Sequence, residues 1–204
     1  MAIPLDTNSR TDDIVDAISR LVLEGGFERV TMRAIAQQVR ISPGTLVNHL
    51  TNRERILRVC AFRFADRRMR ELDEQVRRVG AVGLMPMDDH DLRSARVWLA
   101  WREVARHAEG PAHAVAEADQ KEEWLLRRAL TRDGPPLPDS AVQLCLATLH
   151  GLREAVCARD GHALDVAAAR DLWLSQLESA QLGEATASAR ARSSATIASG
   201  SSAE

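Results

Sequence analysis

One stretch of the sequence, TMRAIAQQVRISPGTLVNHL at Thr31–Leu50, decides the fold of the N-terminal region. Its apolar residues recur at helical spacing in two short runs, one around Ile35 and one around Leu46. Between the runs, Ser42-Pro43 is typical of a helix start, because serine caps a helix and proline fits its first position. The stretch therefore predicts two short helices around a tight turn, with Ile35, Ala36, Val39, Ile41 and Leu46 in a small shared core.

The second of these helices opens in a way that favours phosphate binding. Ser-Pro-Gly-Thr places free backbone N–H groups and hydroxyls at a helix N-terminus, where the helix dipole attracts an anion. Two short helices of this kind form a helix-turn-helix, whose second helix enters the major groove of DNA. The stretch therefore predicts a DNA-binding element.

Working outward, helical patterns account for almost all the remaining sequence. No segment shows sustained period-two alternation, so the expected fold is all-α. Thr11 is expected to cap the first helix and Gly25-Gly26 to end it, while Thr51 and Glu54 fit a capping box. The other breaks fall at Gly80, Gly83 and Pro86, at the expected turn Gly110-Pro111, and at 134–138. The expected helices are 12–24, 52–79, 89–108, 112–131, 139–158 and 165–182.

We expect four regions along the chain: a flexible arm at 1–9, a helix-turn-helix DNA-binding domain at 10–58, a helical ligand-binding and dimerisation domain at 59–182, and a disordered tail at 183–204. Charge follows the same division. Residues 10–70 hold twelve Arg and seven Asp or Glu, a net charge of +5, whereas residues 81–204 hold thirteen basic and eighteen acidic side chains, a net charge of −5. A basic N-terminal third is expected where one part of a protein meets phosphate.

Composition argues against several other classes of protein. No apolar run approaches the length of a membrane span, and the N-terminus lacks signal-peptide features, so a soluble cytoplasmic protein is expected. Cys60, Cys145 and Cys157 are too scattered for a disulfide framework and are interpreted as small buried apolar residues, a redox sensor being the alternative. Asp88-Asp89-His90-Asp91 is interpreted as a helix cap in preference to a metal cluster. No metal or cofactor is expected.

The stretch Thr31–Ala36, then Val39–Leu50, then Arg53-Glu54, together with Arg10–Phe27, resembles the DNA-binding domain of TetR-family transcriptional regulators. The body more weakly resembles the BetI-type branch, at Trp98-Leu99-Ala100-Trp101 and Leu149-His150-Gly151-Leu152. The resemblance implies a homodimeric repressor that binds a palindromic double-stranded DNA operator and is released by a small-molecule effector. The helices 139–158 and 165–182 would pair with their two-fold mates, and charging Leu149 or Leu177 would then break the dimer.

By this resemblance, the DNA-binding residues are Thr31, Arg33, Ser42, Gly44, Thr45, Val47, Asn48, His49 and Arg53. Within the set, Arg33, Thr45 and Arg53 are expected at phosphates, and Asn48 and His49 at base edges. The sequence departs from the family pattern at Arg40, where glycine is usual and a side chain in the expected left-handed turn costs about 1 kcal/mol. It also departs at Val47, where tyrosine is usual, and at Leu50, where an aromatic residue is usual.

The resemblance also implies an effector pocket in the helical body. Large aromatic side chains there have arginines as unusual neighbours in sequence, which suggests a cavity that binds a polar small molecule. The expected lining is Phe62, Trp98, Trp101, Arg102, Trp124, Arg128, Leu149 and Arg153.

Two other classes of function remain as hypotheses. An all-α metal-dependent enzyme would use the acidic and histidine-bearing helices, although no Glu-x-x-His pair, HExxH motif or Ser-His-Asp set is present in the sequence. A helical adaptor without DNA binding is the third hypothesis, because Arg40 and Val47 depart from the family pattern.

Overall fold

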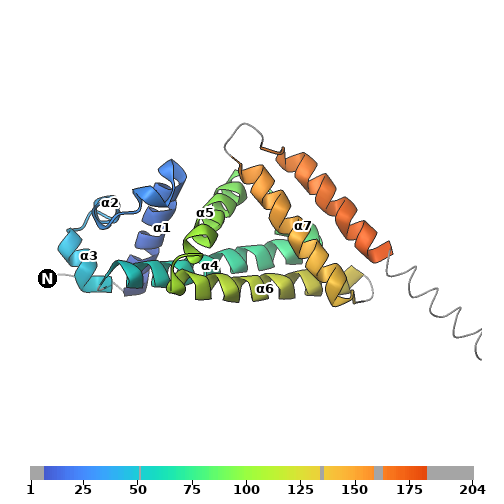
Figure 1. Cartoon of the computed structure of the whole chain (residues 1–204), viewed down its shortest axis with the longest axis horizontal. Helices are drawn as coiled ribbons and strands as arrows, with labels where there is room; N and C mark the ends of the chain where they lie inside the picture. Colours follow the sequence, from blue (N-terminus) through green and yellow to red (C-terminus); the bar gives the residue numbers. More distant parts are fainter. Residues whose placement is uncertain (1–6, 51, 134–135, 159–162, 183–204) are drawn as a thin grey trace, which may run out of the picture. The chain divides into compact units, whose positions relative to one another are not determined.

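The structure, a computed structural model, describes residues 7–50, 52–133, 136–158 and 163–182. Within these ranges the chain consists of α-helices, short 3₁₀ helices and their connections, with no strand, which confirms the all-α prediction (Figure 1). Residues 1–6 of the predicted arm and the predicted tail at 183–204 lie outside the described residues.

The chain divides into two compact units. One contains the residues up to 74 together with 86–122, and the other contains 75–85 and the residues from 123 onward. The predicted domain boundary at 58 falls within the long helix α4, Arg53–Val79, which is continuous through it. The boundaries of the two compact units therefore differ from those of the DNA-binding and ligand-binding domains expected from the sequence.

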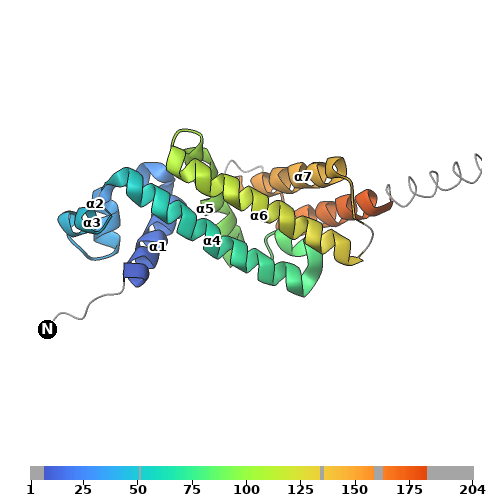
Figure 2. The same cartoon turned by 90° about the horizontal axis from the view of Figure 1, so that it is seen from below.

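The first unit holds the helix-turn-helix. Helices α1 (Thr7–Gly25), α2 (Met32–Gln38) and α3 (Pro43–Leu50) gather at the N-terminal end of α4 (Figures 1 and 2). Their shared core contains Ile18, Ile35, Leu46 and Ile56, all almost fully buried. The unit also contains η1 (Phe27–Arg29), α5 (Asp89–Ala105) and the first part of α6 (Glu109–Asp133).

Two expected helix starts lie several residues too late, and α4 has a different cap from the one expected. Helix α1 begins at Thr7, so Thr11 is a buried residue inside the helix and not its cap, and residues 7–9 of the predicted arm are helical. The side chain of Asn52 caps α4 by accepting from the N–H of Arg55 at 2.8 Å, whereas Thr51 lies outside the described residues. The expected turn at Gly110-Pro111 lies in the first turn of α6, where proline removes no helical hydrogen bond.

The second unit is organised around the 3₁₀ segment η2 (Gly80–Leu84) that follows α4. Buried Arg153, from α7 (Asp139–Cys157), donates from Nε to the carbonyl oxygen of Leu84 at 3.0 Å. Buried Trp173 donates from Nε1 to the carbonyl oxygen of Ala81 at 2.9 Å. Figure 2 shows the helix of residues 166–182, which carries Trp173, running beside α7. The last two helices thus satisfy buried carbonyls of the segment that ends α4.

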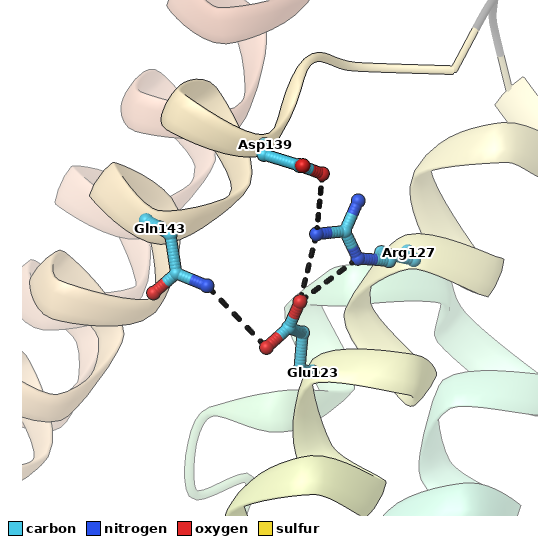
Figure 3. A network of polar contacts seen from close by, with 4 residues as sticks. All are labelled: Glu123, Arg127, Asp139 and Gln143. Atoms are coloured by element: carbon cyan, nitrogen blue, oxygen red, sulfur yellow. Dashed lines mark hydrogen bonds and ion pairs between the residues drawn. The ribbon is translucent and has the colours of Figure 1, made fainter.

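A polar network joins the end of α6 to the start of α7 within the second unit (Figure 3). Arg127 donates to Glu123 from Nε at 3.0 Å and from a terminal nitrogen at 2.7 Å, and lies 2.9 Å from a carboxylate oxygen of Asp139. Gln143 donates to the other oxygen of Glu123 at 3.3 Å. The hydrogen bonds to Glu123, and to a smaller extent the one to Asp139, raise the pKa of Arg127 above its usual range. The network thus links the end of α6 to the first turns of α7.

Gly83 provides a test of the packing around η2. A Cβ at this position would lie 2.8 Å from the backbone carbonyl carbon of Gln75, which cannot rotate away. We expect Gly83→Ala to lower the free energy of unfolding by about 1–3 kcal/mol, measured by urea denaturation. Gly25→Ala is the control, because the nearest atom to its Cβ belongs to the exposed side chain of Arg29, which can move. Equal stabilities of the two variants would contradict this account of η2.

Candidate nucleic-acid interface

The turn between α2 and α3 has the hydrogen bonds of a Schellman motif. The N–H of Ile41 donates to the carbonyl oxygen of Ala36 at 2.9 Å, and the N–H of Arg40 donates to that of Gln37 at 3.2 Å. This pair of bonds requires a left-handed residue at the position of Arg40, whose φ is 56°. A side chain in this conformation costs about 1 kcal/mol relative to glycine. The strained turn predicted at Arg40 is therefore present, and it sets the direction in which α3 leaves α2.

Helix α3 begins at the predicted cap. Ser42 accepts at Oγ from the N–H of Thr45 at 3.0 Å, and the hydroxyls of these two residues lie 2.8 Å apart. Pro43 occupies the first helical position. The hydroxyls of Ser42 and Thr45 thus hold each other at the end of α3 whose free N–H groups favour an anion.

Thr31 has a structural role as well as its predicted one. Its side-chain oxygen accepts from the N–H of Ala34 at 3.2 Å and caps α2. Because α2 begins here, Arg33 lies in the first turn of that helix, with its side chain exposed.

The predicted DNA-binding residues are accessible wherever the structure describes their side chains. Leu46 is fully buried and anchors α3, whereas Val47 on the same helix is 42% exposed and points away from the core. Nothing is described for the side chain of His49. The exposed members of the set are Thr31, Arg33, Ser42, Gly44, Thr45, Val47, Asn48 and Arg53. Helix α3 thus has one buried anchoring face and one exposed face that combines polar groups with the apolar side chain of Val47.

Of the predicted pocket residues, Phe62, Trp98, Trp101 and Arg102 lie in the first unit. The two tryptophans are buried, Trp98 stacked on Phe64 with ring centroids 6.4 Å apart and Trp101 edge-on to Phe27 at 4.7 Å. Arg102 forms an ion pair with Asp119. Phe62 lines a groove of about 430 Å³ between α4 and α6, together with Met69, Glu117 and Lys121 among others.

The other four members, Trp124, Arg128, Leu149 and Arg153, lie in the second unit. Leu149 is fully buried, and Arg153 holds Leu84 as described above. Trp124 is 56% exposed, with the guanidinium of Arg128 over its ring at 4.4 Å from the centroid. Each described side chain has a local packing or polar contact within its own unit, and a shared effector pocket stays a prediction.

Two grooves of the first unit were not anticipated from the sequence. One, of about 350 Å³, lies among α1, α4 and α5 and includes the ion pair between Arg67 and Asp16 at 2.7 Å. The other, of about 370 Å³, is lined by Arg55, Arg58 and His113 among others, at the starts of α4 and α6. Their residues are far apart in sequence, so only the packing of the helices reveals them.

The acidic run before α5 is a helix cap, as predicted. Asp88 accepts from the N–H of Asp91 at 2.9 Å, and Asp91 in turn accepts from the N–H of Met87 at 2.9 Å. The hydrogen bond from Asp91 is the main reason that the pKa of Asp88 is lowered. Side-chain atoms of Asp88, His90 and Asp91 lie within 4.8 Å of one another, but both aspartates are engaged as caps.

The cysteines are buried, as predicted for small apolar residues. Burial, with a smaller contribution from the carboxylate of Asp12, raises the pKa of the Cys60 thiol to about 12. Burial likewise raises the pKa of Cys145. Because thiolates are the reactive form, this environment disfavours a redox role for either residue.

Comparison with known proteins places the helix-turn-helix in a family. A family model described as bacterial regulatory proteins, tetR family, matches residues 14–60, which span the core of α1 through the first turns of α4. Residues 14–60 thus form a helix-turn-helix domain similar to that of the tetR family.

Solved structures of transcriptional regulators share the fold over most of the chain. A transcriptional regulator from Rhodococcus sp. Rha1 is 18% identical, with a TM-score of 0.74 over 85% of this chain and 96% of that one. A regulator from Saccharomonospora viridis in complex with choline is 14% identical, with a TM-score of 0.68 over 84% and 96%. FadR from Bacillus subtilis in complex with stearoyl-CoA is 16% identical, with a TM-score of 0.56 over 81% and 96%.

Comparison with curated proteins finds no match for this chain. None of its described helices combines the length and apolarity that a membrane span requires.

Val47 offers a test of how the exposed face of α3 reads DNA. An exposed valine has no donor for a phosphate, so its favourable use is an apolar contact with a thymine methyl group. We expect Val47→Tyr to raise affinity for generic DNA while lowering the preference for one thymine in each half-site. Val47→Ala should lose that preference with little change in melting temperature. Competition binding on single-base operator variants measures both effects, and a uniform response of Val47→Ala across the variants would remove Val47 from the reading surface.

Proposed function

We propose that this protein is a transcriptional regulator that binds a palindromic operator as a homodimer, acts as a repressor, and is released by a small-molecule effector. The proposal rests on the exposed polar face of α3. Buried Leu46 anchors this helix and Ser42 caps its N-terminus. Arg33 and Thr45 would contact phosphates, Asn48 and His49 would reach base edges, and Arg53 would contact a flanking phosphate. In a two-fold dimer, two such helices would read half-sites about one helical turn apart or a small multiple of it.

The second unit supports the proposed dimer by its exposed apolar residues. Leu144 on α7 is 59% exposed, and Leu172 on the helix of residues 166–182 is 53% exposed. Gly151 on α7 is also exposed, and a Cβ there would meet no atom within 4 Å, so this face of the helix is free for close approach. Exposed apolar residues on the last two helices are suited to packing against a second copy of the chain.

The residues expected to break the dimer need revision. Leu149 is fully buried and Leu177 is 8% exposed in the single chain, so a charge at either position would disturb the unit itself. The exposed residues of the same helices are the suitable probes.

Effector release is proposed by analogy with structures of the same fold. Two of them hold small molecules, choline in one and stearoyl-CoA in the other. In this chain an effector would shift the population between a DNA-binding state and a released state, through its different affinity for the two. The residues predicted to line its site remain the eight named from the sequence.

DNA binding is tested by fluorescence anisotropy with the region upstream of the protein's own gene and with a random-sequence duplex. The wild-type protein should bind the upstream DNA more tightly, with strong salt dependence. Arg53→Ala should weaken binding to both DNAs similarly and lower the slope of log K against log salt by about one unit per subunit. An unchanged slope would remove Arg53 from the phosphate contacts, and absence of binding by the wild type would favour the adaptor hypothesis.

The dimer is tested by sedimentation of variants that spare the single-chain fold. We expect Leu172→Asp and Gly151→Arg to give monomers with nearly unchanged helical content, because both positions are exposed in one chain and buried in the proposed dimer. Val79→Asp is the control, since Val79 is similarly exposed but lies at the end of α4. Dimers of both variants with wild-type affinity would place the interface elsewhere.

A further inference from the structure

Arg40 stands out because of its backbone. Among the described residues it is the one non-glycine residue with a positive φ, at 56°. The other described residues with a positive φ are Gly26, which follows α1, and Gly80, which follows α4. Among the described residues, the chain thus has glycine at the other two positions of positive φ and arginine only in the turn of the helix-turn-helix.

No contact in the part of the chain that the structure describes accounts for this arginine. Its side chain is exposed and makes no hydrogen bond or ion pair with any described residue. Its backbone N–H bonds to Gln37, but glycine would make that bond equally well. The side chain therefore stabilises neither the turn nor the core, and the turn would be less strained without it.

The position of Arg40 suggests what the charge does. Arg40 lies two residues before Ser42, whose hydroxyl caps α3. Helix α3 carries the exposed face proposed to contact DNA. A guanidinium beside this helix start would add a charged donor next to the N–H groups of α3. Strained residues that persist at functional surfaces do so where the strain places a useful group.

We propose that Arg40 is an additional DNA-contacting residue that binds a backbone phosphate beside the N-terminus of α3. The contact carries no base information, so it raises affinity for all sequences alike. Removal of this one side chain should therefore raise the stability of the protein and lower its affinity for DNA. This inference rests on the proposed function, since it requires α3 to meet DNA.

The test compares melting temperature and DNA binding in the full-length protein, with a short random-sequence duplex as the probe. Arg40→Gly should raise the melting temperature by about 2–4 °C, because it relieves the left-handed side chain. The same variant should bind the duplex about three- to tenfold more weakly, with the slope of log K against log salt lowered by about one unit per subunit. Arg40→Asn, which tolerates the turn without charge, should show the same change in slope.

Two controls separate a local contact from a general charge effect. Arg40→Lys keeps the charge and the strain and should keep the wild-type slope. Arg70→Gln removes one exposed charge that pairs with Asp66 at 3.3 Å and lies about 25 Å along α4 from Arg53, so the slope should not change.

The outcomes distinguish this inference from the proposed function. If the wild type binds the duplex and Arg40→Gly binds with the same affinity and slope, the inference is wrong and the proposed function stands. An equal loss in Arg70→Gln would also overturn it, because the effect would then be that of net charge. If the wild type binds no DNA, both are wrong.

Discussion

The turn that joins α2 to α3 is the constraint on which the proposed activity depends. Its two backbone hydrogen bonds, from Ile41 to Ala36 and from Arg40 to Gln37, fix where α2 stops. The Ser42 side chain fixes where α3 starts. Between these points the chain has little freedom, so buried Leu46 can anchor α3 while Val47 and Asn48 stay on its outer face. A change of conformation at this turn would move the whole exposed face.

In both units, hydrogen bonds satisfy backbone groups at a described helix end. In the second unit, Trp173 and Arg153 donate to Ala81 and Leu84, carbonyls of the segment that follows α4. The last two helices, proposed to form the dimer, thus hold the end of the helix whose beginning carries Arg53.

Much of this organisation could be predicted from sequence, because the signals were local. Ser42-Pro43, the left-handed turn at Arg40 and the cap at Asp88 each depend on residues within a few positions of one another, and each is present. The expected start of α1 is wrong because Thr11 is a good cap in isolation but is buried inside the helix. The grooves and the burial of Leu149 and Leu177 depend on which helices meet, which periodicity does not reveal.

The central claim is that α3 reads DNA in the major groove, and methylation interference on the region upstream of the gene tests it most directly. Methylation of guanine N7 blocks the major groove, whereas methylation of adenine N3 blocks the minor groove. The account predicts that N7 methylation interferes with binding in two clusters related by two-fold symmetry, with their centres about one helical turn or a small multiple apart. Interference by adenine N3 methylation alone, or no interference at guanine N7, would contradict it.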